Sequence, residues 1–129
     1  MIEKAIKSWH QAIINISEDS LKTVLAEDVV FHSPVVHTPQ KGKKTTSKYL
    51  VSALTVLNNG GFEYCREVFN GQHAVLEFKT EIDGIVINGV DMISINEQGE
   101  ICDFKVMIRP LQGVNIVHKK VGEMLALSK

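Results

Sequence analysis

Cysteine is scarce in this chain: Cys65 and Cys102 are the two cysteines in 129 residues, and they lie far apart in strand-like segments. Neither belongs to a Cys-x-x-Cys motif or to a Cys/His spacing typical of zinc sites, so we expect no disulfide framework and no metal site. The simplest interpretation is a pair of buried, reduced thiols in a cytoplasmic protein.

An excess of charge of one sign is also lacking. The net charge of -1 gives no basic surface for nucleic acid, and the cluster Lys41, Lys43 and Lys44 is small. No apolar run approaches the roughly 20 residues of a membrane span. The first residues, Met1-Ile-Glu-Lys4, do not have the pattern of a signal peptide. We therefore expect no nucleic-acid partner and no membrane partner.

Several motifs that would indicate a cofactor-binding site or a catalytic nucleophile are missing. Gly60-Gly61 ends a predicted helix rather than opening one, so the chain has no glycine-rich phosphate cradle. It has no Gly-x-Ser-x-Gly motif and no plausible Cys/His nucleophile pair. His32 and His37 match no metal-binding spacing and are interpreted as loop histidines. No cofactor is expected.

What the chain does have is apolar periodicity, first with a helical period. This pattern predicts a helix over residues 2–16, a short helix capped by Ser17, a helix after Gly42 capped by Thr45 or Thr46, and a final amphipathic helix after Pro110. A strand is predicted around residues 29–31. It leads into the segment 31–42, here called the hook, which is read as an edge strand broken by two prolines.

Between the third and the last helix the period changes to two. Strands are predicted at about 62–69, 73–82, 85–95 and 100–109, separated by turn sequences that suit antiparallel hairpins. Helices followed by a meander of antiparallel strands indicate an α+β fold in one domain, residues 1–129.

The two last strands carry apolar side chains on both faces, for example Val90 and Met92 against Ile93 and Ile95. Helices in so short a chain can cover one face of a sheet. We therefore predict that the other face packs against a second subunit, giving a homodimer.

Asp91 is the best single indication of a site, because a carboxylate among apolar neighbours is costly to bury unless it is paired, hydrogen-bonded or protonated. A structural role remains open, in which Asp91 pairs with Arg109 or with a backbone donor. Arg109 has three alternatives of its own: capping a pocket, bridging a dimer or facing water. Trp9, Tyr49 and Tyr64 each carry a polar group that needs a partner if it is buried.

The order of helices, the hook with Pro34, Pro39 and Gly42, and the meander that ends in Ile108-Arg-Pro-Leu111 resemble the nuclear transport factor 2-like superfamily. That superfamily includes SnoaL-like cyclases, ketosteroid isomerases and limonene-epoxide hydrolases. The resemblance covers nearly the whole chain. It implies a cone in which a curved sheet wraps around helices, with a pocket inside and commonly a dimer.

Within this resemblance, the ketosteroid isomerase machinery is only partly present. The resemblance places Ser33 at the position of the general base, Trp9 at that of a tyrosine donor, and Asp91 at that of a protonated aspartic acid donor. Loss of the base removes a factor of about 10² to 10⁴, so isomerase activity by that mechanism is not expected. The resemblance also covers the positions at which the epoxide hydrolases use an arginine and two aspartates to orient water. These positions hold Val75, Glu77 and Val106 here, so Glu77 is the one carboxylate that remains.

Three hypotheses follow. The first is a domain that binds a small, mostly apolar molecule, with Asp91 as the polar anchor. The second is an isomerase- or cyclase-type enzyme that uses Asp91 as acid and base. The third is a protein-interaction module that uses the sheet face. The expected lining of the pocket is Trp9, Ser33, Tyr49, Asp91, Phe104 and Val106.

Overall fold

The computed structural model describes residues 1–127. Four helices and six strands follow one another, and their mixture confirms the α+β class. The helices are α1 (Ile2–Ile14), α2 (Glu18–Lys22), α3 (Lys43–Leu57) and α4 (Leu111–Leu127). The strands are β1 (Leu25–His32), β2 (Gln40–Lys41), β3 (Glu63–Asn70), β4 (His73–Ile82), β5 (Ile85–Ile95) and β6 (Ile101–Arg109).

The strands form one sheet in the order β2-β1-β6-β5-β4-β3. Strands β3 to β6 make the predicted antiparallel meander, and β1 joins it by pairing parallel to β6. The prediction of an edge strand in the hook is confirmed in part: β2, at the end of the hook, pairs with β1 and takes the edge position, whereas residues 33–39, which contain both prolines, form no strand. This parallel pairing places the hook beside β6, the last strand in the sequence.

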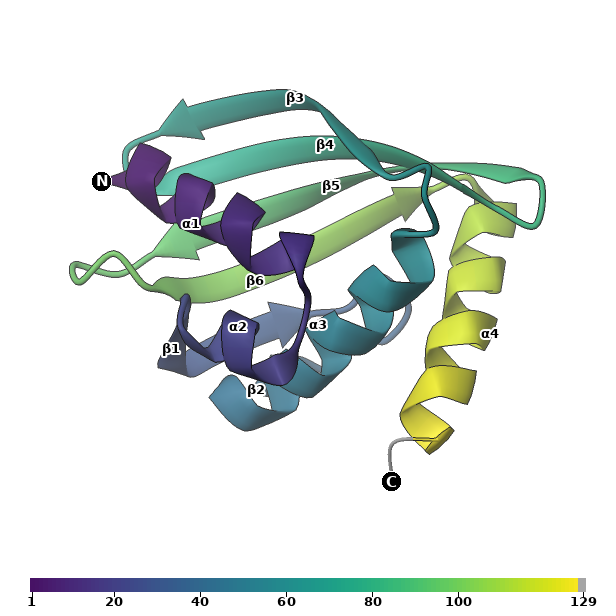
Figure 1. The fold of residues 1–129 in the computed structure, drawn as a ribbon, viewed down its shortest axis with the longest axis horizontal. Helices are drawn as coiled ribbons and strands as arrows, with labels where there is room; N and C mark the ends of the chain where they lie inside the picture. Colours follow the sequence, from purple (N-terminus) through teal and green to yellow (C-terminus); the bar gives the residue numbers. More distant parts are fainter. Residues whose placement is uncertain (128–129) are drawn as a thin grey trace.

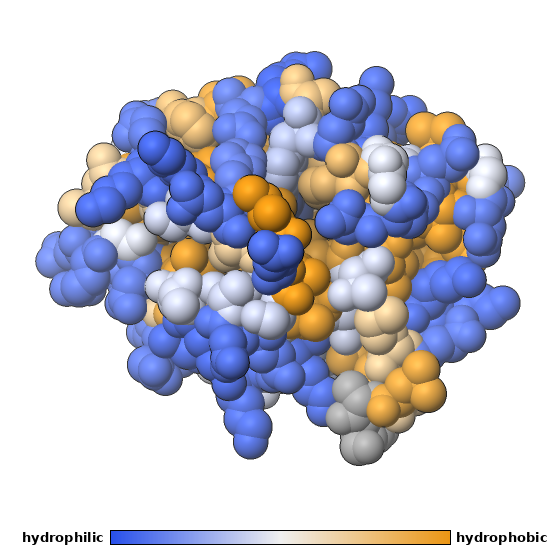
Figure 2. All heavy atoms as spheres, in the orientation of Figure 1, coloured by the Kyte–Doolittle hydropathy of each residue, from blue (hydrophilic) through white to orange (hydrophobic). Residues whose placement is uncertain are grey.

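The sheet is curved, and the helices lie on its concave side (Figure 1). Large apolar side chains from both layers fill the space between them, including Trp9, Phe78 and Phe104, each at most 1 % exposed. The face that carries α1 and α4 is mostly hydrophilic outside, with apolar side chains gathered near the middle of the view and along α4 (Figure 2). None of the helices described is long and apolar enough to cross a membrane.

The helix starts differ in how well the sequence predicts them. Ser17 caps α2 as predicted, in a reciprocal pair with Ser20. The prediction that Thr45 or Thr46 caps α3 was wrong, because the chain turns earlier. Gly42 is the N-cap residue, with a φ of 95° that favours glycine, and its carbonyl accepts a hydrogen bond from the Thr46 N–H at 3.0 Å.

Both thiols are free, as predicted, but the prediction that they are buried was wrong. Cys65 is exposed and Cys102 is half-buried. Cys65 lies in the edge strand β3, where the register shifts between Tyr64 and Arg66. Such an irregularity interrupts the alternation of inward and outward side chains. The prediction of a buried Cys65 relied on that alternation.

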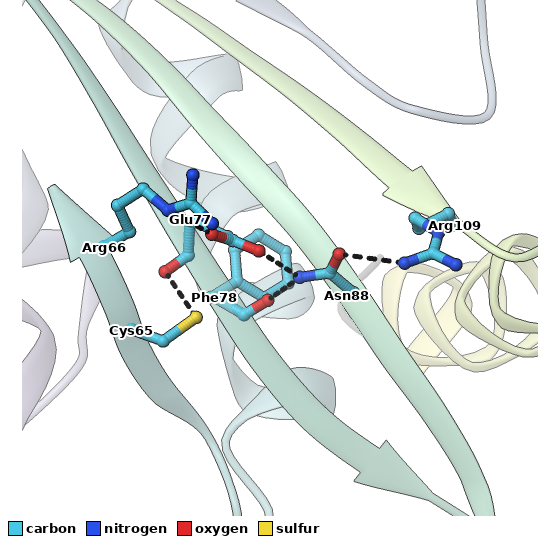
Figure 3. Close-up of polar contacts among 6 residues, drawn as sticks. All are labelled: Cys65, Arg66, Glu77, Phe78, Asn88 and Arg109. Atoms are coloured by element: carbon cyan, nitrogen blue, oxygen red, sulfur yellow. Dashed lines mark hydrogen bonds and ion pairs between the residues drawn. The ribbon is translucent and has the colours of Figure 1, made fainter. Parts of the chain in front are cut away.

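The convex face of the sheet carries apolar residues and a row of polar ones. Val68, Val86, Met92 and Met107 are exposed there, between 38% and 61%. Beside them Arg66, Glu77, Asn88 and Arg109 are linked across β3, β4, β5 and β6 (Figure 3). In this chain alone, the helices leave that face open to solvent.

Candidate functional site

A cavity of about 170 Å³ lies between the concave face of the sheet, the hook, α3 and α4. Its wall is mostly apolar, with the rings of Phe31, Phe78 and Phe104 from the sheet and mainly aliphatic side chains from the two helices. The described residues that line it include Ser33, Tyr49, Asp91, Phe104 and Val106, all of which the sequence had suggested.

Asp91 reaches this cavity from the middle of β5. Every second residue of β5 faces the concave side, namely Ile87, Gly89, Asp91 and Ile93. Asp91 is 4% exposed. Burial in apolar surroundings raises the pKa of Asp91 from 3.8 to about 7, and the hydrogen bond from Tyr64 partly opposes this rise. Near neutral pH the carboxyl group therefore exchanges its proton readily.

The carboxyl group of Asp91 belongs to a chain of three side chains. The Tyr64 hydroxyl donates to Asp91 Oδ2 at 2.6 Å, and Trp9 Nε1 donates to the Tyr64 oxygen at 3.0 Å. Burial and the neighbouring Asp91 charge raise the pKa of Tyr64 well above 10, so the phenol keeps its proton. Because that proton is directed at Oδ2, a neutral Asp91 carries its own proton on Oδ1.

Asp91 Oδ1 makes no hydrogen bond within residues 1–127, while the residue lines the cavity. Protonated, this oxygen can donate to a carbonyl; ionised, it can accept a proton. The chain thus places a polar group that can gain or lose a proton in a mostly apolar chamber.

Sequence reasoning gave Trp9 a place in the cavity wall, whereas the structure puts it behind Tyr64. Trp9 is fully buried and packs on Phe104 with ring centroids 4.9 Å apart. Tyr64 was left out of the predicted site, although its need for a hydroxyl partner was noted. The missing information was the register: Tyr64 pairs with Phe78, which pairs with Gly89, two residues from Asp91.

The other polar candidates lie elsewhere. Arg109 donates to Asn88 at 3.4 Å on the convex face, so the structure excludes its pairing with Asp91. Glu77 faces the same side and pairs with Arg66 at 3.0 Å, away from the cavity. His118, which sequence reasoning did not consider, lines the cavity from α4. The sequence around His118 does not indicate that this residue lines the cavity.

His32 Nε2 lies within hydrogen-bond distance of Asp103 Oδ1, at 2.9 Å, and His37 is exposed in the hook. Within residues 1–127 no three or more His, Cys, Asp and Glu side chains are grouped so that they could hold a metal ion.

Comparison with known proteins places the fold. A scan against protein-family models finds no match, and a search of curated proteins finds no relative. Among solved structures, a steroid delta-isomerase from Pseudomonas aeruginosa is 32% identical, with a TM-score of 0.91 over 98% of this chain and 93% of that one.

Two further solved structures agree. A protein with a cystatin-like fold from Silicibacter pomeroyi is 28% identical, with a TM-score of 0.86 over 93% of this chain and 84% of that one. An NTF2-like protein of unknown function from Mesorhizobium loti is 15% identical, with a TM-score of 0.72 over 84% of this chain and 91% of that one, a likeness of fold alone.

Proposed function

Because the chain belongs to the nuclear transport factor 2-like superfamily, we propose that it binds a small, mostly apolar molecule in its cavity, with Asp91 as the polar anchor. The observation that carries the proposal is the Asp91 carboxyl group, buried in an apolar chamber and tied on one side only, to Tyr64. A ligand carbonyl would accept the proton that Oδ1 carries when the group is neutral.

The size of the cavity supports a compact ligand. Its volume of about 170 Å³ is smaller than the roughly 300–1000 Å³ of pockets that enclose drug-sized molecules. A single ring, or one end of a longer molecule, suits this space. Two free cysteines are consistent with a cytoplasmic location, which is part of the proposal.

The test is binding of cyclohexanone as a function of pH. In the unchanged protein, we expect affinity to fall as pH rises through about 7, because the ionised Asp91 cannot donate to the carbonyl. Asp91→Asn retains an N–H donor that does not titrate, so its affinity should not change over the same range. Equal affinity and equal pH dependence in both proteins would remove Asp91 from the proposed role.

An isomerase-type enzyme is the second candidate, favoured by the likeness to a steroid delta-isomerase. In this reading His118 on α4 supplies the base that Ser33 cannot provide, and neutral Asp91 donates to the carbonyl oxygen. Conversion of cyclohex-3-en-1-one to its conjugated isomer would test it. Turnover that survives both His118→Gln and Asp91→Ala would contradict this assignment.

We further propose that the convex face of the sheet forms a homodimer. Exposed Met92 and Met107 lie there together with the polar row that ends in Arg66 and Arg109. Apolar groups mixed with arginines are typical of protein interfaces. If the face does not join two copies of this chain, a different protein partner becomes the alternative.

A further inference from the structure

The cavity is open to solvent, and its exposed lining residues come from two segments. Apart from half-buried Ile108, the lining residues from the sheet are buried: Phe31, Phe78, Asp91, Phe104 and Val106. By contrast, Val36 of the hook and His118 and Gly122 of α4 line the cavity and are also exposed. The opening, here called the mouth, therefore lies between the hook and α4, away from the wall that carries Asp91.

The path of α4 explains why the mouth is at this place. Near its start the helix packs closely on the sheet, since a Cβ at Gly113 would lie 3.1 Å from the Ile87 side chain. The helix then runs away from the end of β6, beside α3 (Figure 1). Its cavity-lining residues become less buried along this path, from Val117 at 3% exposed to half-buried Leu125.

Gly122 lies in this second half of α4, and packing does not require a glycine there. A Cβ at Gly122 would meet nothing within 4 Å, so the space around it is open. Inside a helix, glycine is the least favourable residue apart from proline. The chain therefore has a glycine that lowers helix stability at a position where its missing side chain leaves room at the mouth.

The chemistry around the mouth is apolar and carries little charge. The neighbouring lining residues are Pro34 and Val36 of the hook and Val121 and Leu125 of α4. No lysine, arginine or glutamate is among the described residues that line the cavity. Such a surface favours an alkyl group over a charged one, because the alkyl group loses no hydration when it is covered.

We propose that the ligand is a cyclic ketone with an unbranched alkyl chain, whose ring lies against Asp91 and whose chain leaves the cavity through the mouth, past Gly122. This inference rests on the proposed function, since it names the class of ligand for the same site. It also accounts for the cavity volume of about 170 Å³, which would hold the ring and the start of the chain.

The test compares two probes, cyclohexanone and 4-butylcyclohexanone, which share the ring and the ketone and differ in the chain. Binding is measured by calorimetry at about pH 6, where Asp91 is mostly protonated. We expect 4-butylcyclohexanone to bind about tenfold more tightly to the unchanged protein, as the burial of two methylene groups allows.

Gly122→Phe should place a ring in the mouth and reduce this preference to less than about threefold. Ala126→Phe is the matched control, because Ala126 is exposed one turn further along α4 and does not line the cavity, and it should keep the preference. Phenylalanine is more favourable than glycine in a helix, so thermal unfolding should show that Gly122→Phe is folded.

A preference that Gly122→Phe leaves unchanged or makes larger would overturn the path of the chain through the mouth. Equal binding of the two ketones to the unchanged protein would overturn the alkyl chain while leaving the proposed function intact. If neither ketone binds, the proposed function fails, and this inference fails with it.

Discussion

At the scale of single residues, the buried Asp91 carboxyl group carries a cost that depends on pH. In the unfolded chain it ionises above about pH 4, whereas in the fold its pKa is about 7. Between these values the folded state binds more protons than the unfolded state, so the free energy of unfolding falls as pH rises. Above pH 7 this loss levels off.

Asp91→Asn removes that titration and keeps an oxygen to accept from Tyr64. We expect the Asp91 contribution to lower the free energy of unfolding of the unchanged protein by about 3 kcal/mol between pH 5 and pH 8, and the variant to lack this part of the change. Urea unfolding at both pH values measures the difference. The same pH profile in both proteins would mean that Asp91 titrates normally in the fold.

The residues of the site were predictable in part. Asp91 stood out because a carboxylate interrupts an apolar strand, and the alternation of β6 placed Phe104 and Val106 on one face. The link from Trp9 through Tyr64 to Asp91 crosses three elements, and no local pattern encodes which hydroxyl meets which carboxyl group.

At the scale of elements, the strands and helices were mostly predictable because turn sequences mark their ends. The hairpin at Asp83 and Gly84 shows this, since both residues have positive φ values of 50° and 81°. The parallel pairing of β1 with β6 joins residues about seventy positions apart. The spacing of apolar residues along the sequence does not indicate such a contact. That pairing is what brings the hook to the cavity.

Gly89 controls how closely β5 can lie to its neighbours. A Cβ there would lie 2.7 Å from the backbone oxygen of Met107 and would run into the Phe78 ring, which lines the cavity. We expect Gly89→Ala to lower the free energy of unfolding by about 1–3 kcal/mol, because the backbone of β6 must move. Thermal and urea unfolding measure the effect.

Gly122→Ala is the matched control, because a Cβ at this position of α4 meets nothing within 4 Å. A helix gains about 1 kcal/mol from that exchange, so this variant should be as stable as the unchanged protein or more so. A Gly89→Ala protein of unchanged stability would show that the strands can separate without cost.

At the scale of the whole molecule, the proposed homodimer should depend on the convex face. We expect sedimentation velocity to show a dimer, and the double variant Met92→Glu with Met107→Glu to shift it to a monomer, since four carboxylates would be brought together. Ile14→Glu is the control, because Ile14 is 72% exposed on α1, on the other side of the sheet. A monomer at all concentrations of the unchanged protein would contradict the dimer.

Whether Asp91 is the polar anchor can be measured by an NMR titration of its carboxyl carbon, with and without cyclohexanone. We expect a pKa of about 7 in the free protein and a higher pKa with the ketone bound, because the ketone stabilises the protonated group. A pKa near 4 that does not move with the ketone would contradict both the state of Asp91 and its role as the anchor.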